Sequence, residues 1–365
     1  MEITDLEKID NFNWYYKGLF TWHRKYYLKG KRIVFFGEKI EGKKFSVVLK
    51  KLKIDNNYIE LLKEIYFLCC CQRSKYFIRL IDILISEDKN YIFLILKDEG
   101  ASLSEIIDYT QENEEGFDYT KIEDMIKKVI FQIICGLYLL HKSGLIHHDI
   151  KSSNILISSN GMVKIADFGS VDKIGTYGFG TLYYESPEIL LKKKAREKDD
   201  MWAVGVIMAE LYQKNYPYFN NSHSGNKKIS QLKSILSKYK IIINNEEINI
   251  DNNNNFKFIK EIIIEKNAFE NYNLKTELMC LDEITDPDAI DLIKNLLHIN
   301  PEKRFSAEQA LNSKYLSKYK NNFEQKEITF KNIDYDNLIN ATNKEDFVKN
   351  VEKIKEKFLG DVLFE

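Results

Sequence analysis

The stretch LIHHDIKSSNILI, residues 145–157, places charged and polar side chains between two apolar runs. Asp149, Lys151 and Asn154 follow one another at offsets of two and three residues, and a second carboxylate, Asp167, comes thirteen residues after Asn154 in the sequence ADFG. An amide and a carboxylate that meet at one point form an oxygen-rich site of the kind that Mg²⁺ shares with phosphate oxygens. The other aspartate can then orient a hydroxyl, and the lysine can neutralise a transferring phosphoryl group. The spacing therefore predicts a site for phosphoryl transfer.

Strands and one helix are predicted ahead of this loop. Residues 26–53 alternate like a series of β-hairpins, with RIVFFGEKI and FSVVLKKL separated by the turn EGKK. NNYIELLKEIYFLC then has apolar residues at helical spacing and an asparagine that can cap a helix. FIRLIDILIS and NYIFLIL follow as two more strands. These elements predict a small β-rich lobe over residues 26–96.

The pattern becomes helical after the polar stretch KDEGAS. A long helix is predicted over residues 121–142, and ILISSNGMVKIAD is predicted to form a strand, a turn around Asn160-Gly161 and a second strand. An Asn-rich section over about residues 220–275, which includes NNNN at 252–255, is typical of a surface insertion with a mobile loop.

The predicted fold is α+β and bilobal, with a small β-rich N-lobe and a larger, mainly helical C-lobe. The hinge is expected near residues 96–102. In chain order we expect an N-terminal extension, the N-lobe, the C-lobe with its Asn-rich insertion, and a charged helical C-terminal extension, over residues 1–25, 26–96, 97–320 and 321–365. The pattern leaves open whether the last segment covers the body of the protein or is a solvated helix.

Charge balance and cysteine usage argue against several classes of protein. The 54 basic and 55 acidic side chains give a formal net charge of -1, so no basic field favours nucleic-acid binding. Five cysteines, three of them adjacent at 69–71, indicate buried thiols in a reducing compartment. The N-terminus does not read as a secretory signal, and the longest apolar runs are shorter than the ~20 residues of a membrane span. We expect a cytoplasmic or nuclear protein that binds neither nucleic acid nor membrane.

Three motifs, HHDIKSSN, DFG and SPE, resemble those of the eukaryotic protein kinases and occur in the same order. Five further segments resemble the family as well, namely VVLK, LLKEI, TLYYESPEILL, DDMWAVG and INPEKR. This resemblance covers roughly residues 26–320, and it argues against the alternative that the loop is merely a polar turn between two strands. It implies an ATP-dependent serine/threonine protein kinase that uses Mg²⁺ and acts on a protein substrate.

The resemblance also implies a role for each polar residue of the loop. Asp149 would accept or orient the proton of the substrate hydroxyl, and Lys151 would contact the transferring phosphate. Asn154 and Asp167 would hold magnesium, and Thr181 would help to seat the acceptor residue. A lysine two residues after the catalytic aspartate is the serine/threonine-type pattern.

Residues of the N-lobe are expected to hold the nucleotide phosphates. By resemblance, Lys50 in the VVLK strand would contact the α- and β-phosphates and be held in place by Glu64. Lys51 would face away from Lys50, because successive side chains of a strand point to opposite faces. Glu60, one helical turn before Glu64, is the alternative partner, but the apolar Leu68 one turn after Glu64 favours Glu64.

Further residues are assigned by the same resemblance. Leu156 would form the floor of the adenine site, and the remaining nucleotide contacts would come from the ceiling, the hinge and the phosphate loop, at Val48, Leu96, Asp98 and Gly30. Asp200 would brace the catalytic loop, and Arg304 would pair with Glu188. Four apolar or aromatic side chains would stack into a spine that joins the lobes, namely Leu68, Leu80, His147 and Phe168.

Three departures from the family pattern bear on activity. Aligned back from Lys50, the Gly-rich loop reads LKGKRIVF and keeps only Gly30, and a loop without its other glycines approaches phosphate oxygens less closely. The family's H-R-D arginine is His148, a weaker partner for a phosphate on Thr176. Glu185 stands where the cyclin-dependent and mitogen-activated kinases, the group that the chain resembles most, carry an arginine.

An active kinase is the expectation, because none of the metal-binding or catalytic residues is missing. The alternative is a pseudokinase that acts as a binding or allosteric scaffold, which the divergent Gly-rich loop favours. A regulatory subunit such as a cyclin stays an alternative only because the chain resembles the cyclin-dependent kinases. The helical stretch NNYIELLKEI itself carries no recognisable cyclin-binding signature.

Overall fold

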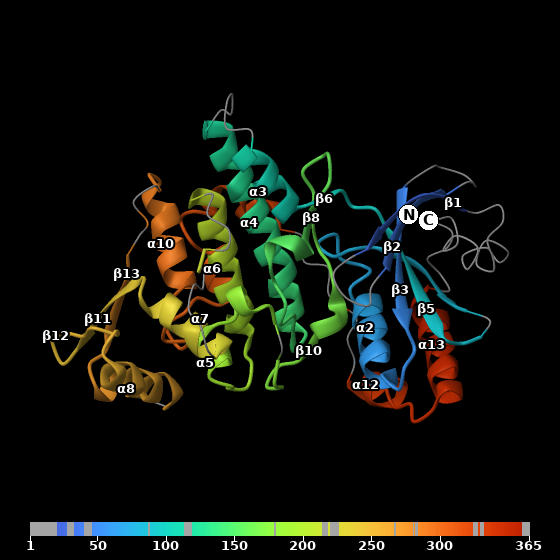
Figure 1. The fold of residues 1–365 in the computed structure, drawn as a ribbon. Helices are drawn as coiled ribbons and strands as arrows, with labels where there is room; N and C mark the ends of the chain where they lie inside the picture. Colours follow the sequence, from blue (N-terminus) through green and yellow to red (C-terminus); the bar gives the residue numbers. More distant parts are fainter. Residues whose placement is uncertain are drawn as a thin grey trace. The chain divides into compact units, whose positions relative to one another are not determined.

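A five-stranded antiparallel sheet forms the N-terminal part of the computed structural model (Figure 1). The order of its strands in space is β1-β2-β3-β5-β4. The β-branched and aromatic side chains of the VVLK and YIFLIL segments favour this extended conformation. The strands are β1 (Phe20–Tyr27), β2 (Ile33–Lys39), β3 (Ser46–Lys53), β4 (Leu80–Ile85) and β5 (Tyr91–Lys97).

Most of the chain is described by the structure. The described residues are 20–27, 33–39, 46–86, 88–112, 119–178, 180–213, 218–219, 226–265, 268–279, 281, 284–323, 328 and 332–359.

The chain divides into two compact units at Gly100, within the expected hinge. The first unit consists of residues 1–100 and 328–365, and the second of residues 101–327. The C-terminal segment thus belongs with the N-terminal sheet and not with the helical part of the chain that precedes it. The sheet also begins earlier than the pattern predicts, since β1 starts at Phe20.

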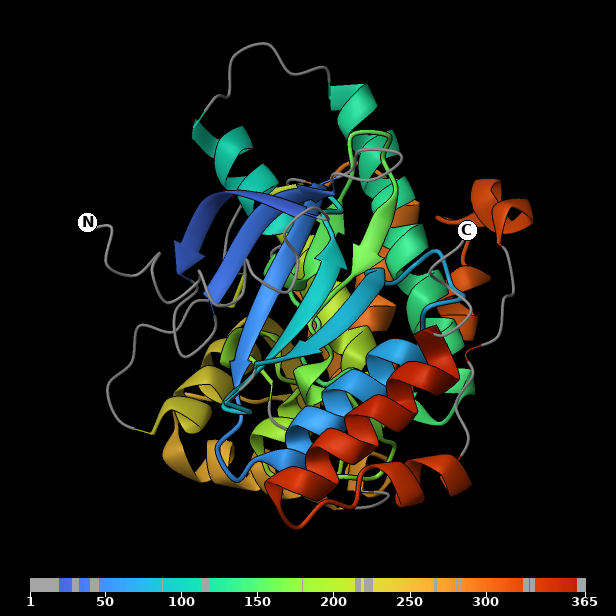
Figure 2. The same cartoon turned by 90° about the vertical axis from the view of Figure 1, so that its right-hand side faces the viewer.

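Three helices accompany the sheet of the first unit within its described residues. They are α2 (Tyr58–Cys70), α12 (Asn332–Leu338) and α13 (Lys344–Leu359). Figure 2 shows α2 and α13 side by side, and α13 also contacts β4. Two segments from opposite ends of the sequence therefore pack together in this unit.

Helices α4 and α6 form the centre of the second unit, with α6 buried on all sides. Twelve of the seventeen residues of α6 are buried, which explains why MWAVGVIMAELY is apolar all round. The helices are α3 (Leu103–Glu112), α4 (Tyr119–Lys142), α5 (Pro187–Leu190), α6 (Glu197–Gln213), α7 (Lys227–Leu236), α8 (Asn253–Ile264), α9 (Ala268–Asn271), α10 (Pro287–Leu296) and α11 (Ala307–Leu311).

Short strands carry the polar loops of the second unit. The predicted strand–turn–strand at 155–167 is present, because Ile155 pairs with Ile165 in an antiparallel ladder. The sheets have the orders β6-β8-β9, β7-β10 and β12-β11-β13. Their strands are β6 (Ala101–Ser102), β7 (Leu145–Ile146), β8 (Ile155–Ile157), β9 (Val163–Ile165), β10 (Asp172–Lys173), β11 (Tyr239–Ile243), β12 (Glu246–Glu247) and β13 (Lys275–Leu278).

The Asn-rich tract at 252–255 corrects one expectation. Instead of a mobile loop, it forms the N-cap and the first turn of α8. The side chain of Asn252 accepts hydrogen bonds from the backbone N–H groups of Asn254 (2.9 Å) and Asn255 (3.4 Å). Asparagine is a preferred N-cap residue, so a run of asparagines can start a helix as readily as it can form a loop.

Candidate active site

Asp200 fixes the backbone of the polar loop from its place in the first turn of α6. Its carboxylate accepts hydrogen bonds from the backbone N–H groups of His147 (2.9 Å) and His148 (3.0 Å), and lies 2.8 Å from Nε2 of His141. Burial opposes its ionisation, but the bond from His141 and the neighbouring charges hold the pKa of Asp200 below its ordinary value. These bonds keep His148 in a left-handed backbone conformation, with φ of 66°.

Asp149 is the centre of a hydrogen-bonded group that joins four of the predicted residues. Its Oδ1 accepts bonds from the backbone N–H (2.9 Å) and the hydroxyl (2.7 Å) of Thr181. Its Oδ2 accepts a bond from Nζ of Lys151 (2.6 Å) and one from the amide of Asn154 (3.2 Å). The Lys151 ammonium also donates to the Thr181 hydroxyl at 2.9 Å. The aspartate, lysine, asparagine and threonine therefore converge on one point.

The β8–β9 hairpin brings Asp167 to the same loop. Asn154 ends the turn before β8, and its carbonyl accepts a hydrogen bond from the backbone N–H of Ala166 (2.9 Å), the residue before Asp167. Asp167 itself has φ of 63°, a left-handed conformation that is uncommon for residues other than glycine and concentrates at functional sites. Phe168 packs edge-on against His147, with ring centroids 5.8 Å apart.

The Asn154 side chain is held in one orientation. Its amide nitrogen donates to the backbone carbonyl (2.8 Å) and to the carboxylate (3.2 Å) of Asp149. Both bonds use the nitrogen, so Asp149 does not engage the amide oxygen of Asn154. The amide oxygen of this buried residue and the carboxylate of Asp167 are ligands of the hard type that magnesium prefers. The structure thus brings together the two residues predicted as magnesium ligands.

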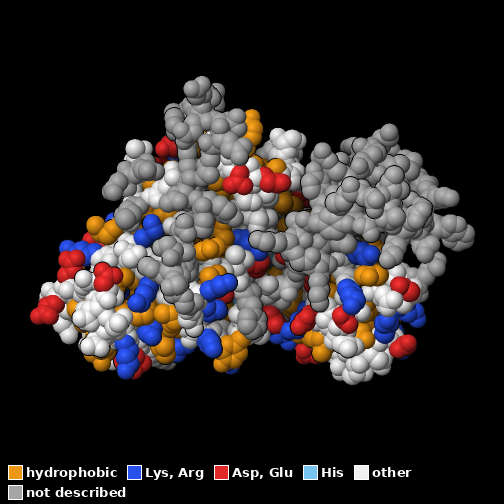
Figure 3. All heavy atoms as spheres, in the orientation of Figure 1, with side chains coloured by type: hydrophobic (Ala, Val, Ile, Leu, Met, Phe, Trp, Pro, Cys, Tyr) orange, Lys and Arg blue, Asp and Glu red, His pale blue; other side chains and the backbone are white. Residues whose placement is uncertain are grey.

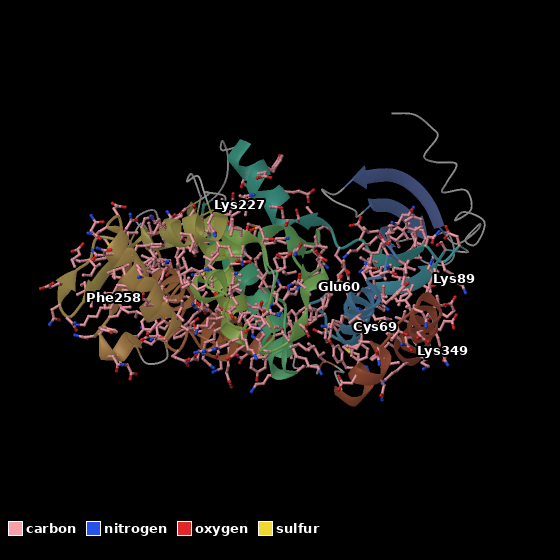
Figure 4. All side chains as sticks on the ribbon, turned by 60° about the horizontal axis from the view of Figure 1, so that its bottom comes forward. Glu60, Cys69, Lys89, Lys227, Phe258 and Lys349 are labelled. Carbon is pink, nitrogen blue, oxygen red and sulfur yellow. The ribbon has the colours of Figure 1, made fainter. Side chains whose placement is uncertain are left out.

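Lys50 and Glu64 form a buried ion pair in the first unit. Lys50 lies on β3 and Glu64 on α2, and their side chains are 11% and 6% exposed. Glu60, the alternative partner, is exposed on the same helix (Figure 4). Lys51 points to the other face of the sheet, where its ammonium lies 3.8 Å from the centre of the Tyr91 ring. The ion pair in the structure is therefore the expected one, formed by Lys50 and Glu64 and not by Lys51 or Glu60.

The residues predicted to contact the nucleotide lie in both units. Val48 is half-buried on β3 and pairs in register with Leu96, which is buried on β5. The Asp98 carboxylate accepts a bond from the backbone N–H of Gly100 (3.1 Å) and so is used in the turn after β5. Leu156 is half-buried on β8 in the second unit. Gly30 lies outside the described residues. The predicted spine residues Leu68 and Leu80 are buried in the first unit.

Arg304 and Glu188 form a second buried ion pair, as the motifs predict. Nη1 and Nη2 of Arg304 donate to the two carboxylate oxygens of Glu188 at 2.6 and 3.0 Å. The arginine is fully buried and lies over the Trp202 ring, 4.9 Å from its centre. Burial opposes ionisation, but Arg304 holds the pKa of Glu188 below its ordinary value. Burial and the neighbouring Glu188 raise the pKa of Asp199, 3.6 Å from Arg304, well above its usual range.

Two of the departures from the family pattern have partners within the chain. Glu185 is buried, and its carboxylate lies 2.8 Å from Nζ of Lys228 on α7. Nε2 of His148 lies 3.3 Å from the hydroxyl of Thr176, which also donates to the backbone carbonyl of Lys173 (2.9 Å). The activation segment therefore contacts the loop of Asp149 at His148 through the Thr176 hydroxyl, in addition to the contacts of Thr181 with Asp149 and Lys151.

Glu210 is a functional candidate that the motifs do not predict. It lies near the end of α6, where its carboxylate accepts bonds from the hydroxyls of Ser152 (2.8 Å) and Tyr184 (3.0 Å). It thereby connects the loop of Asp149 to the segment after Thr181. Burial raises the pKa of Glu210 to about 7. The sequence could have indicated Glu210, because it is the single acidic residue in the apolar run MWAVGVIMAELY. A carboxylate in such a run is expected to be buried and therefore to need hydrogen-bond partners.

Comparison with known proteins identifies similar sequences over most of the chain. A family model described as the protein kinase domain matches residues 37–316. The chain is 31% identical over 293 residues to the probable serine/threonine-protein kinase KIN28 homolog of Encephalitozoon cuniculi, which covers 78% of this chain and 86% of that protein. It is 29% identical over 297 residues to cyclin-dependent kinase 12 of Caenorhabditis elegans (74% of this chain, 37% of that protein). Identity to mitogen-activated protein kinase HOG1 of Chaetomium globosum is 33% over 207 residues (54% of this chain, 52% of that protein). The chain thus aligns with about half or less of the length of the last two relatives.

Proposed function

Because the chain belongs to the protein kinase family, we propose that it transfers the γ-phosphoryl group of ATP to serine and threonine hydroxyls of protein substrates at the site around Asp149. The observation that supports this most directly is the carboxylate of Asp149, which already accepts a hydrogen bond from a hydroxyl, that of Thr181, at 2.7 Å. Lys151 stands beside it with its ammonium 2.6 Å from the other carboxylate oxygen. A hydroxyl acceptor and a cation at one point are what phosphoryl transfer requires.

The proposed reaction is a direct displacement at phosphorus. The substrate oxygen forms a bond to the γ-phosphorus, the bond from that phosphorus to the β,γ-bridging oxygen breaks, and ADP leaves with the electron pair. Asp149 orients the attacking hydroxyl and receives its proton. Lys151 neutralises charge on the transferring group, and Thr181 keeps both side chains in place through its two hydroxyl contacts.

Asn154 and Asp167 are proposed to hold the magnesium ion. The family uses ATP and typically Mg²⁺, and the amide oxygen and carboxylate described above fit an ion that takes one or two protein ligands and completes its shell with phosphate oxygens and water. When bound, the ion neutralises charge on the phosphate oxygens. The bonds from the Asn154 amide nitrogen to Asp149 fix the distance between the metal ligands and the group that receives the proton.

Lys50 is proposed to bind the α- and β-phosphates, with Glu64 as the residue that positions it. A lysine ammonium has three donors and no fixed direction, so a buried carboxylate is needed to hold it at one place. Val48, Leu96, Asp98, Leu156 and Gly30 remain proposed nucleotide contacts. The ionic residues of the chemistry are all present, which supports a catalyst over a scaffold that only binds nucleotide.

The partners and location of the protein follow as proposals from its surface and its thiols. We propose protein substrates and no binding of nucleic acid, since acidic and basic side chains are interspersed over the described part of the face in Figure 3. No helix among the described residues is long and apolar enough to cross a membrane. The four described cysteines are free and buried, which is consistent with a reducing cytoplasm or nucleus. The name of the cyclin-dependent relative adds a regulatory subunit as a further candidate partner.

Asp149→Asn tests the proposal. The substitution keeps the size of the side chain but removes the proton acceptor, and we expect phosphate transfer from ATP to a generic protein substrate to fall by about 10²- to 10⁴-fold. Asp291→Asn, at an exposed position on α10, is the matched control and should leave the rate unchanged. Equal rates for the wild type and Asp149→Asn would remove Asp149 from its proposed role.

A thermal-shift titration with ATP and Mg²⁺ separates an enzyme from a scaffold that lacks nucleotide binding. A ligand that binds only the native state raises apparent stability by RT ln(1 + [L]/Kd), which is about 2.7 kcal/mol at a hundredfold excess over Kd. We expect stabilisation of the wild type and of Asp149→Asn, and less stabilisation of Lys50→Met. No stabilisation of the wild type at millimolar ATP would favour a pseudokinase.

A further inference from the structure

Helix α2, which carries Glu64, is buried far more completely than its neighbouring sheet alone requires. Nine of its thirteen residues are buried, and they include Tyr66 and Phe67 at 0% exposure. A helix that covers one face of a sheet needs an apolar stripe on one side only. Helices α12 and α13, from the C-terminal end of the chain, lie against α2 and account for the additional burial (Figures 1 and 2).

Aromatic contacts join α2 to the two C-terminal helices. The Tyr66 ring meets Tyr335 of α12 at 5.7 Å and, edge-on, Phe358 of α13 at 5.6 Å between centroids. Phe67 stacks on Tyr335 at 5.1 Å. At the start of α2, Tyr58 meets Phe347 of α13 at 5.8 Å. The contacts therefore run from the first turn of α2 to its third.

Two lysines of α13 attach the same helix to the sheet. Nζ of Lys355 lies 2.5 Å from the Asp82 carboxylate on β4 and donates to the backbone carbonyl of Ile83 at 3.2 Å. At the other end of α13, Nζ of Lys344 donates to the side chain of Asn90, ahead of β5, at 2.9 Å. Helix α13 is thus fixed to the sheet at two points while its aromatic residues press on α2.

The position of Glu64 on α2 gives these contacts a functional meaning. Residues two apart on an α-helix point about 200° away from each other, so Tyr66 lies nearly opposite Glu64. The Glu64 side of α2 meets β3 through the Glu64–Lys50 pair, and the side of Tyr66 meets Tyr335 of α12 and Phe358 of α13. Loss of the second set of contacts would allow α2 to move away from Lys50.

We propose that residues 332–359 form a built-in brace that holds α2 in the position where Glu64 meets Lys50. This inference rests on the proposed role of Lys50 in binding ATP. Tyr335 and Phe358 are then positioning residues for the phosphate-binding lysine. The brace also fills the side of α2 that carries Tyr58 and Tyr66, so that side is not available to a separate regulatory subunit. The chain needs no partner at α2 to assemble its Lys50–Glu64 pair.

Four variants of the full chain, compared with the wild type, test the brace. Phe358→Ala and Tyr335→Ala each remove one ring that contacts Tyr66, and the conservative Phe358→Leu restores most of the lost contact area. Phe258→Ala on α8 is the matched control, because Phe258 is also half-buried and also meets a tyrosine, Tyr272, edge-on at 4.9 Å (Figure 4). Its side chain belongs to the second unit, far in the sequence from α2.

The expected results concern ATP affinity and the protection of α2. If the brace is lost, only a fraction of molecules keeps α2 in place, and the apparent affinity for ATP falls by that fraction. We expect Phe358→Ala and Tyr335→Ala to raise the KM for ATP by roughly fivefold to tenfold, with a smaller change in kcat. Amide hydrogen exchange at residues 61–68 should accelerate by a similar factor. Phe258→Ala should change neither quantity by more than about twofold, and Phe358→Leu should return both most of the way to wild type.

Several outcomes would overturn the brace. Unchanged exchange at residues 61–68 in both alanine variants would do so, as would an equal rise in KM for Phe258→Ala. If the two alanine variants do not fold, Lys355→Ala, which removes only the polar tie to Asp82, must still accelerate exchange in α2 and raise the KM. A wild-type chain that transfers phosphate only after addition of a second protein would refute independence from a partner. Absence of phosphate transfer altogether would refute the proposed function, while the exchange measurement would still decide the brace.

Discussion

Replacement of Arg304 by methionine is expected to destabilise the protein by about 3–5 kcal/mol at pH 7. The arginine is fully buried and makes two short bonds to Glu188, whose side chain is only 8% exposed. Its loss leaves Glu188 and Asp199 together in a buried site without a cation, whereas methionine roughly fills the space of the arginine stem. The main cost is therefore an uncompensated buried carboxylate, not a cavity.

The size of this deficit should depend on pH. In the native protein Arg304 lowers the pKa of Glu188, so Glu188 contributes stability above its unfolded pKa, near 4.5, and loses it as the pH falls through the lowered value. Without Arg304, burial dominates and the pKa of Glu188 must rise. The variant then gains stability as the pH falls, because its native state binds the extra proton. The difference between wild type and variant should be largest at pH 7 and clearly smaller at about pH 5.

Urea unfolding of the full chain at these two pH values measures the difference. The matched control is Arg196→Met, because Arg196 pairs with Glu302 on the surface, where the side chains are 54% and 72% exposed. Exposed pairs contribute about 0–1 kcal/mol, so the control should lose little at either pH. A deficit for Arg304→Met below about 1 kcal/mol, or one that is the same at both pH values, would refute the reasoning about the buried carboxylates.

Three further predictions concern the activation segment and the loop that it contacts. Lys228→Ala should cost about 1–2 kcal/mol in urea unfolding, because the buried Glu185 carboxylate loses its cation, and the double variant with Glu185→Gln should recover most of the loss; no recovery would contradict the pairing. Thr176→Glu should not raise kcat/KM by more than about twofold, because the substitution removes the Thr176 hydroxyl contact and His148 offers no arginine fork to the new carboxylate; a tenfold activation in the kinase assay would contradict this. Burial raises the pKa of Glu210 to about 7, so its stabilising contribution is present in acid and lost as the pH rises through that value. The wild type should therefore lose about 1 kcal/mol between pH 6 and pH 8 that Glu210→Gln does not lose, and parallel curves would refute the assignment.

The local parts of the site could be predicted from the sequence. Asp149 and Asn154 are five residues apart in one loop, and a short hairpin brings Asp167 back to them, so few alternatives exist for their arrangement. The sequence favours Glu64 over Glu60 as the partner of Lys50, because the apolar Leu68 lies one helical turn after Glu64. Both Glu64 and Leu68 are buried in the structure. The Glu188–Arg304 pair spans 116 residues, and only the resemblance to a family could predict it.

Contacts between distant segments could not be predicted in this way. The pattern of α13 shows that one of its faces is apolar, but a periodic pattern does not say which surface covers that face. Lys228 is one of many lysines in the chain, and nothing in its neighbourhood indicates Glu185 as its partner. Asparagines over about residues 220–275 are typical of a surface insertion with a mobile loop, but the same side chain is also a strong N-cap, and at 252–255 it starts a helix.

The departures at His148 and Glu185 share one physical consequence. Each stands where the family carries a permanently charged arginine, and in each case a contact within the chain takes its place: the His148 imidazole near the Thr176 hydroxyl, and the Lys228 ammonium against Glu185. Both contacts form without a phosphate group on Thr176. Together with the proposed brace on α2, these contacts hold α2 in the first unit and the activation segment in the second through the chain's own residues. We therefore expect the activity of the purified chain to depend on ATP and Mg²⁺ but not on prior phosphorylation, and treatment with a protein phosphatase that abolishes activity would contradict this.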